Sequence, residues 1–148
     1  MIRKAEKRDR QAYLEMAHEF YHSPAVLHPV PDSYLEATFE ECMRSDIYSV
    51  CYIMEVNGKY AGYALISKTF SQEVGGRVYW LEELYIRESY RSKGLGRAFF
   101  AMIEEEKNHG VKRFRLEVEE ENHRAIALYE RMGYKRLEYK QMIKDFDA

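Results

Sequence analysis

The feature that most constrains this chain is a basic loop with two glycines, set between a predicted strand and a predicted helix. Residues 78–86 are rich in aromatic and branched side chains, as strands are. Apolar residues then recur at helical spacing from Leu95 to Ile103. Gly94 and Gly96 allow a close backbone approach, and the free N–H groups and dipole of a helix start attract anions. The junction therefore predicts a phosphate or pyrophosphate site at the end of a strand. The cations around it are Arg87, Arg91, Lys93 and Arg97.

Length and charge narrow the class of protein. The 148 residues predict one domain, residues 1–148, with a single core. Hydrophobic residues make up 46% and charged residues 32%, as in globular proteins, and the net charge is −2. This balance argues against a nucleic-acid binder, so the basic loop suits a small phosphorylated ligand. No apolar run is long enough to span a membrane.

The two cysteines, Cys42 and Cys51, point away from metal and redox chemistry. They show neither metal-ligand spacing nor a C-x-x-C pair, and we expect no metal. Free cysteines and the lack of a recognisable signal peptide predict a reducing cytoplasm. Cys51 is a weak candidate for an acyl-carrying nucleophile, because no base lies beside it in the sequence.

Periodicity predicts an α+β (mixed α/β) fold. Asn57-Gly58 is a strong hairpin signal between two strands, and Asp32 or Ser33 can cap a helix after the proline-rich stretch 21–31. We expect a mainly antiparallel sheet of six to seven strands, with a parallel β-α-β unit around the glycine loop. The predicted strands are 1–4, 49–56, 60–70, 78–86, 112–119 and one or two within 134–143. The four predicted helices are 7–21, 34–43, one from 95 that ends at Asn108-His109-Gly110, and 122–132.

Acidic, amide and phenol groups gather around the predicted β-α-β unit. Glu82 and Glu83 lie on the strand that enters the loop, and Glu117 lies on the next strand. Asn122 and Tyr129 are two turns apart on one helix and can share a face. Adjacent strand residues point to opposite faces unless a bulge intervenes, so only one of Glu82 and Glu83 should face an acceptor. This arrangement suits group transfer.

Two segments together resemble the GNAT superfamily of N-acetyltransferases. Arg91-Ser92-Lys93-Gly94-Leu95-Gly96 fits that family's pattern, in which Arg or Gln is followed by x-x-Gly-x and then Gly or Ala. The run from Asn122 to Tyr134 looks like its second motif, in which an Asn opens a helix and Leu-Tyr-Glu-x-x-Gly-Tyr closes it. The order of elements covers essentially the whole chain. The resemblance implies a GNAT-like fold and an N-acetyltransferase that moves an acetyl group from acetyl-CoA to a primary amine by direct attack in a ternary complex.

The resemblance also implies roles for individual residues. The backbone of Ser92–Arg97 would hold the CoA pyrophosphate, and the strand end would pair with the pantetheine arm. A backbone N–H near Leu84 would face the thioester oxygen, whose charge grows in the transition state. Tyr129 would return a proton to the departing thiolate. The expected cofactor-binding residues are Leu84, Tyr85, Ile86, Arg91, Ser92, Lys93, Gly94, Leu95, Gly96, Arg97, Asn122 and Tyr129.

The sequence does not decide which group acts as the base. A primary ammonium has a pKa near 10, so the acceptor must lose a proton before it attacks. Polyamine-acetylating relatives carry Leu-Glu-Asp where this chain has Leu81-Glu82-Glu83, which favours Glu82, with Glu83 beside it. Relatives that acetylate ribosomal proteins place a glutamate five residues before the Asn, which is Glu117 here. Ordered water or deprotonation of the substrate alone are the remaining alternatives.

The acceptor is the least specified part. In this fold the loop between the first two helices, here residues 21–33, helps to wall the acceptor site, and nearby glutamates weakly favour a small cationic amine over a peptide. A homodimer is an expectation from the family likeness alone. One rival is a dinucleotide-binding unit, which Phe99 disfavours because it occupies the third glycine position of that fingerprint. Another is a non-catalytic acyl-CoA-binding sensor or interaction module of the same fold.

Overall fold

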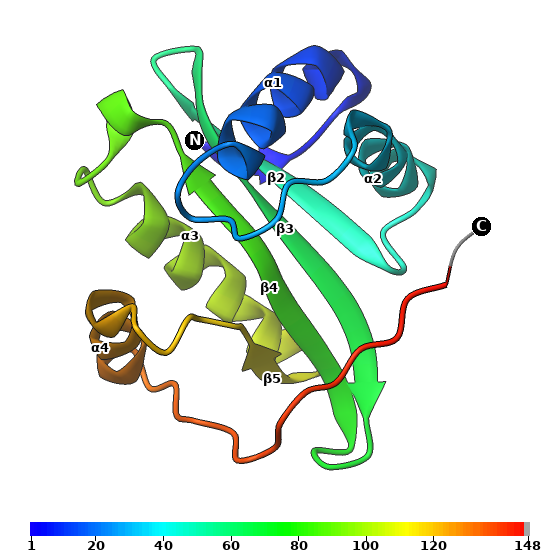
Figure 1. Cartoon of the computed structure of the whole chain (residues 1–148), viewed down its shortest axis with the longest axis vertical. Helices are drawn as coiled ribbons and strands as arrows, with labels where there is room; N and C mark the ends of the chain where they lie inside the picture. Colours follow the sequence, from blue (N-terminus) through cyan, green and yellow to red (C-terminus); the bar gives the residue numbers. More distant parts are fainter. Residues whose placement is uncertain (147–148) are drawn as a thin grey trace. The chain divides into compact units, whose positions relative to one another are not determined.

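The computed structural model of the chain describes residues 1–146 and divides it into two compact units, Met1–Leu116 and Glu117–Ala148. The first unit holds the sheet and three of the four α-helices (Figure 1). Within the described residues, no helix has the length and apolarity that a membrane span requires.

The first unit is a five-stranded sheet in the order β1-β2-β3-β4-β5. Neighbouring strands are antiparallel except β4 and β5, which are parallel. The predicted mainly antiparallel pairing and the predicted parallel β-α-β unit are therefore confirmed. The strands are β1 Ile2–Lys4, β2 Ser49–Val56, β3 Lys59–Ser71, β4 Gly76–Ile86 and β5 Val111–Arg115. The helices are α1 Arg10–Tyr21, α2 Asp32–Arg44 and α3 Leu95–Glu104, with short 3-10 turns η1 Lys7–Asp9, η2 Glu88–Tyr90 and η3 Glu105–His109.

The β2–β3 hairpin forms as its sequence predicts. Asn57 has φ 52° and Gly58 has φ 76°, so both central residues are left-handed, as a two-residue turn of this kind requires. This turn pairs Val56 with Lys59 and fixes the start of the ladder.

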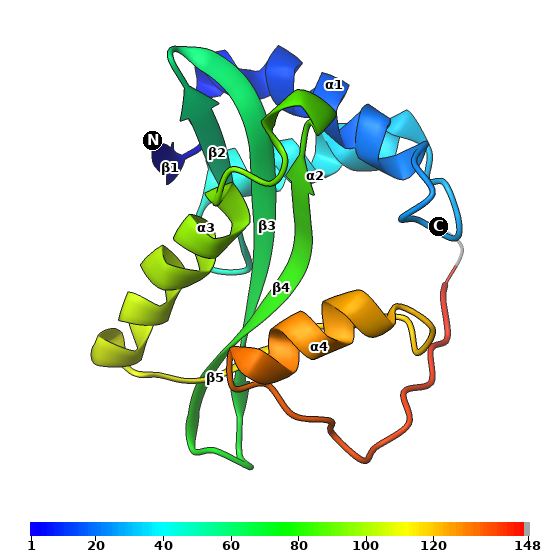
Figure 2. The same ribbon diagram turned by 90° about the vertical axis from the view of Figure 1, so that its left-hand side faces the viewer.

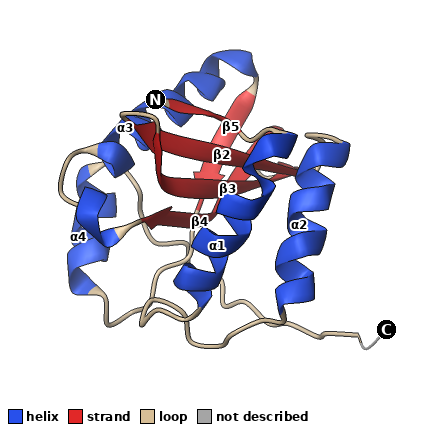
Figure 3. Cartoon of the chain, turned by 90° about the horizontal axis from the view of Figure 1, so that it is seen from above, coloured by secondary structure: helices blue, strands red, loops and turns tan. Residues whose placement is uncertain are grey.

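The sheet is covered on both faces. α1 and α2 lie along one face, and α3 lies on the other (Figures 2 and 3). The α1/α2 side buries an aromatic-rich core that includes Tyr13, Phe39 and Tyr63. The α3 side buries a second core around Phe99 and Ile103. Successive side chains of β3 and β4 therefore point alternately into one core and the other.

The second unit contains α4, His123–Arg131. The Asn122 side chain accepts a hydrogen bond from the backbone N–H of Ala125 at 3.2 Å, which confirms the predicted N-cap. Gly133 has φ 97° just after the helix, as predicted for its closing glycine.

Two predictions about chain ends and caps are wrong. The described residues hold five strands rather than six to seven, because the predicted strands within 134–143 do not form. A strand is stable only when its backbone pairs and one face is buried; here Met142 and Ile143 are 94% and 86% exposed. The helix α2 begins at Asp32 after Pro31, and neither Asp32 nor Ser33 caps it with a side-chain bond.

The chain start is fastened to the sheet by a buried carboxylate. Asp9 is fully buried and accepts two hydrogen bonds from the Arg3 guanidinium, at 2.7 and 2.9 Å. It also accepts from the Tyr60 hydroxyl at 2.8 Å and the Glu6 backbone N–H at 2.7 Å. Arg3 further donates to Glu55 at 2.5 Å. The Arg3 guanidinium, helped by these other donors, lowers the pKa of Asp9 to about 2 against the opposing effect of burial.

This network predicts an acid-sensitive contribution to stability. Because the folded-state pKa of Asp9 lies below its unfolded value, the contribution is present above about pH 4 and is lost as the pH falls towards 2. We expect Asp9→Asn to lower the free energy of unfolding at neutral pH by about 2 kcal/mol and to flatten the acid limb. Urea unfolding between pH 2 and 7 measures both. The matched control is Asp46→Asn, an exposed aspartate with long contacts to Lys4 and Lys68, which should change little.

Candidate active site

A β-bulge in β4 sets the geometry of the site. Leu65 of β3 lies opposite Glu83, and the next residue, Ile66, lies opposite Leu81. Glu82 is therefore the extra residue of β4, with no counterpart on β3. The bulge falls on the glutamate pair that the sequence left ambiguous.

The bulge moves Glu83 to the α1/α2 face. Before it, Tyr79 and Leu81 pack into the core under α3. After it, Leu84 and Ile86 pack there. The alternation has thus shifted by one residue, and Glu83 lies across from Leu65 of the α1/α2 core instead of continuing the Tyr79–Leu81 row.

The bulge also marks where β4 parts from β5. Parallel pairing between them runs from Arg77–Val111 to Trp80–Arg115 and stops there. Residues 81–86 keep β3 on one edge, and within the described chain no strand pairs with their other edge. β5 is also shorter than the predicted 112–119. A free edge of this kind can accept an extended ligand arm through backbone hydrogen bonds.

Two phenols hold the Glu83 carboxylate. The Tyr63 hydroxyl donates to Glu83 Oε1 at 2.7 Å, and the Tyr21 hydroxyl donates to Glu83 Oε2. Tyr63 is on β3, whereas Tyr21 is the last residue of α1. Burial, with the negative Glu83 as a further cause, raises the pKa of both tyrosines, so they remain protonated donors at neutral pH.

Aromatic rings line the surroundings of this carboxylate. Phe20 lies with its ring centroid 5.2 Å from Tyr21, 6.4 Å from Tyr63 and 5.8 Å from Tyr85. Tyr63 and Tyr85 are 6.1 Å apart. In the described part of the chain, Glu83 forms no ion pair with a lysine, arginine or histidine. A half-buried anion among rings, with only neutral donors, is suited to receive a cation.

A second acidic group lies farther along the same face but is already paired. Glu19 of α1 accepts hydrogen bonds from Arg87 at 2.9 Å and from the Tyr85 hydroxyl at 2.9 Å. These bonds tie α1 to the end of β4. Hydrogen bonds from Arg87 and Tyr85 outweigh partial burial and lower the pKa of Glu19.

The predicted anion loop has the backbone shape that such a site needs. Ser92 has φ 62° and Gly94 has φ 84°, so two residues just before α3 are left-handed. The first intrahelical bond joins the Ala98 N–H to the Gly94 carbonyl, which leaves the N–H groups of residues 95–97 outside the helical ladder. Turns of this shape form anion-binding concavities.

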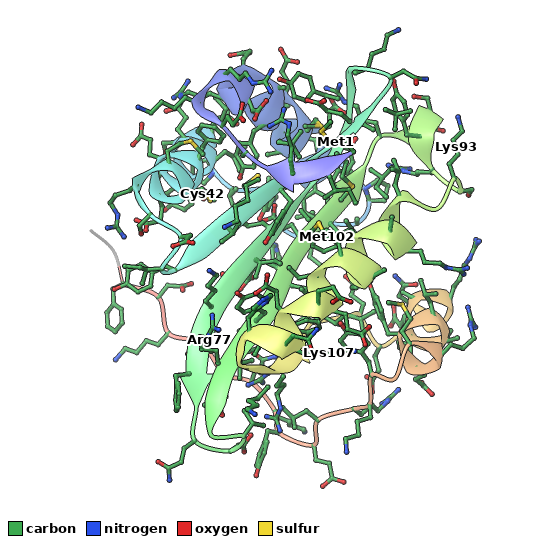
Figure 4. All side chains as sticks on the ribbon, turned by 180° about the vertical axis from the view of Figure 1, so that it is seen from behind. Met1, Cys42, Arg77, Lys93, Met102 and Lys107 are labelled. Carbon is green, nitrogen blue, oxygen red and sulfur yellow. The ribbon has the colours of Figure 1, made fainter. Side chains whose placement is uncertain are left out.

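The cations of the loop are exposed at its rim. Arg91, Lys93 and Arg97 are solvent-exposed, and Lys93 lies in the loop that leads into α3 (Figure 4). Arg91 also donates to the Ile86 carbonyl at 2.7 Å and so braces the loop against the end of β4. The free strand edge and the anion loop therefore follow one another directly along the chain.

The remaining predicted residues are in the second unit. Asn122 caps α4, and Tyr129 lies within α4 with its ring 5.8 Å from Tyr134. Burial raises the pKa of Tyr129. Glu117 is exposed and accepts a hydrogen bond from Gln141 at 3.1 Å.

The two thiols are fully or partly shielded from solvent, and the described residues form no metal-binding cluster. Within residues 1–146, no group of three or more histidine, cysteine and acidic side chains is placed to bind a metal ion. Cys51 is buried, and burial raises its pKa well above the usual value. Burial likewise raises the pKa of Cys42 to about 11. Both thiols are poor nucleophiles in this state.

The strand, loop and helix geometry matches a known family. A model of the acetyltransferase (GNAT) family matches residues 11–134, which include the bulge, the anion loop and α4. The chain belongs to this family. It is therefore an N-acetyltransferase, and the donor that the family uses is acetyl-CoA.

Individual relatives agree with the assignment. An uncharacterized N-acetyltransferase of Bacillus subtilis is 31% identical over 137 residues, which cover 90% of this GNAT chain and 88% of that protein. A spermine/spermidine N(1)-acetyltransferase of the same organism is 33% identical over 110 residues, or 69% of this chain and 71% of that one. The aminoglycoside N-acetyltransferase AAC(6')-Iy, solved with a CoA-S-monomethyl-acetylneamine bisubstrate analogue, shares the fold with a TM-score of 0.79 at 19% identity, over 99% of this chain and 98% of that one.

Sequence reasoning missed the partners of Glu83. Tyr63 and Tyr21 lie 20 and 62 residues away from it. A weak signal existed, because the chain has 13 tyrosines and such a density suits the walls of a pocket. Nothing in the pattern indicates which of them reach the bulge.

Gly62 allows β3 to lie close to the backbone of β4 at Tyr85. A Cβ at Gly62 would lie 2.2 Å from the Tyr85 carbonyl oxygen, which is backbone and cannot yield. We expect Gly62→Ala to lower the free energy of unfolding by about 1–3 kcal/mol in urea titrations. The control is Gly96→Ala, whose Cβ would make ordinary 3.7 Å contacts with Leu84 and Ile86 inside a helix. That variant should be neutral or more stable, and equal effects of both would contradict the steric argument.

Proposed function

We propose that residues 1–148 form one N-acetyltransferase domain that moves the acetyl group of acetyl-CoA to a primary amine by direct attack in a ternary complex. The observation that carries the proposal is the bulged end of β4. On this strand end, a free backbone edge leads into the anion loop, while the Glu83 carboxylate faces the opposite helix pair. Donor and acceptor groups thus come from one strand.

The donor half of the proposal uses backbone groups. The N–H groups at the start of α3 would hold the pyrophosphate, with Arg91, Lys93 and Arg97 supplying charge at the rim. The free edge of residues 84–86 would pair with the pantetheine arm as an added strand does. A backbone N–H near Leu84, beside the bulge, would stabilise the thioester oxygen as it gains charge.

For the acceptor half, we propose Glu83 as the base, acting directly or through one water. It faces the α1/α2 side, it is half-buried, and its two hydrogen-bond donors are neutral. Glu82, the bulge residue, is exposed, and Glu117 is exposed in the second unit. These features favour Glu83 over the other two candidates, including Glu82, which the sequence had slightly preferred.

We propose Tyr129 as the acid that protonates the departing CoA thiolate. Its pKa is raised by burial, so the phenol keeps its proton at neutral pH. Asn122 and Tyr129 both lie within the motif, residues 122–134, that the family model covers. Asn122 is proposed to bind the CoA arm in addition to capping α4.

The acceptor is proposed to be a small cationic amine. Within the described residues the Glu83 carboxylate has no cationic partner. Together with the partly exposed rings of Phe20 and Tyr85, it provides charge and cation–π attraction for an ammonium group. Relatives named for spermine, spermidine and thialysine, and the neamine analogue bound by the aminoglycoside enzyme, support this class. The two free cysteines support a cytoplasmic location, and the homodimer remains a prediction.

The donor assignment predicts a specific effect of Gly94→Ala. Gly94 has φ 84° and open space around it, so a Cβ strains the loop without a clash. We expect the Kd for acetyl-CoA, measured by calorimetry, to rise about tenfold as the loop N–H groups turn away. The matched control is Gly75→Ala, with φ 63° and equally open space in the β3–β4 turn. It should lose similar stability while binding acetyl-CoA normally. Unchanged binding by Gly94→Ala would contradict the assignment.

The transfer reaction itself is tested by an acceptor screen. Spermidine, an aminoglycoside, free amino acids and peptides are offered with acetyl-CoA, and released CoA is measured. We expect turnover with the cationic amines, a fall in kcat/KM of about 10²-fold or more in Glu83→Gln, and a fall in kcat in Tyr129→Phe with donor KM unchanged.

Glu82→Gln is the control for the base and should change kcat/KM little. A larger loss in Glu82→Gln than in Glu83→Gln would move the base role to the bulge residue. Acetyl-CoA binding without turnover on any amine would instead support an acyl-CoA-binding module.

A further inference from the structure

Each oxygen of the Glu83 carboxylate accepts a hydrogen bond from a different tyrosine, and the two tyrosines come from different elements. We propose that Tyr63 and Tyr21 are positioning residues that fix the orientation and charge of Glu83. Through Tyr21, the orientation of Glu83 then depends on the position of the loop between α1 and α2. The inference rests on the proposed role of Glu83 as base.

Tyr63 is the rigid half of this arrangement. Its side chain is 0% exposed, in the middle of β3, and its ring packs edge-on against Tyr13 at 5.1 Å. The packed ring fixes the position of the hydroxyl oxygen, and Glu83 Oε1 lies 2.7 Å from it. This bond crosses the ladder next to the bulge, where Leu65 lies opposite Glu83.

Tyr21 is the half that can respond to the acceptor side. It is the last residue of α1, it is only half-buried, and its ring lies edge-on to Phe20 at 5.2 Å. The connecting loop to α2 begins at the next residue, His22. Any displacement of that loop by a bound amine therefore reaches Glu83 Oε2 through one side chain.

The groups around Glu83 leave the two phenols as the main influence on its protonation. Tyr13 of α1 and Cys51 of β2 are close enough to feel the charge of Glu83: burial is the main cause of their raised pKa values, and the Glu83 charge contributes to both. Arg87 is taken up by Glu19. Hydrogen bonds donated to a carboxylate favour its ionised form, and within the described residues the donors to Glu83 are the phenols of Tyr21 and Tyr63. Removing one phenol should therefore favour the protonated form of Glu83.

Loss of one phenol should move the pH dependence of catalysis to higher pH. A base with a higher pKa stays protonated to a higher pH, so the acid limb of the kcat/KM profile moves up when one phenol is lost. A hydrogen bond to a charged group corresponds to about one pH unit. Loss of orientation additionally lowers kcat while acetyl-CoA binding is unchanged. A merely structural tyrosine would move neither the acid limb nor the Glu83 titration.

The test compares Tyr63→Phe and Tyr21→Phe with wild type by two readouts. NMR titration of isotope-labelled glutamate carboxyl carbons, with Glu83→Gln to assign the signal, follows Glu83 without any need for turnover. The pH profile of kcat/KM, with an amine that stays protonated across the range, follows catalysis. We expect both variants to shift the Glu83 titration and the acid limb upward by about one unit, and Tyr21→Phe also to raise the acceptor KM.

The matched control is Tyr60→Phe. The Tyr60 hydroxyl also donates to a carboxylate, that of Asp9 at 2.8 Å, but it does so in the network at the chain start. This variant should leave the Glu83 titration and the acid limb unchanged. An unshifted Glu83 titration in both site variants would overturn the proposal. A shifted titration with an unshifted acid limb would keep the hydrogen bonds but overturn the positioning role, and an active Glu83→Gln would separately remove the proposed base.

Discussion

The site depends on one extra residue in one strand. The bulge at Glu82 shifts the alternation of side chains along β4. Odd-numbered residues face the α3 core before the bulge, and even-numbered residues face it after the bulge. Without it, Glu83 would continue the row of Tyr79 and Leu81 under α3, where burial of an unpaired carboxylate is costly. With it, a charged residue reaches the face on which two phenols can satisfy it.

In the proposed mechanism, the same irregularity would keep the two substrates apart. Pairing with β5 ends at Trp80, just before the bulge, so the strand beyond has one free edge. That edge is a set of backbone groups in the plane of the sheet, whereas Glu83 projects out of the plane. An arm bound along the edge and an amine held above the face would approach the same few residues from perpendicular directions, as the proposed direct transfer requires.

Local sequence signals predicted the parts of the fold that local chemistry determines. Asn57-Gly58, the Asn122 cap and the glycines at Gly94 and Gly133 each depend on a few neighbouring residues, and each was confirmed in its predicted place. The choice between Glu82 and Glu83 was out of reach, because it depends on how β3 registers against β4. The partners Tyr21 and Tyr63 are likewise long-range. The segment 134–143 has strand-like composition, yet pairing decides whether a strand forms, and composition does not report pairing.

The state of the two thiols has a practical consequence. Cys51 is buried and Cys42 partly so, and burial keeps both mostly protonated at neutral pH. Thiol–disulfide exchange proceeds through the thiolate and requires access. The intact protein should therefore react slowly with chromogenic disulfide reagents, while released CoA, a free thiol in solution, reacts quickly. Turnover can then be followed continuously with the native sequence, and no cysteine needs to be replaced to keep the reaction of the reagent with the protein's own thiols low.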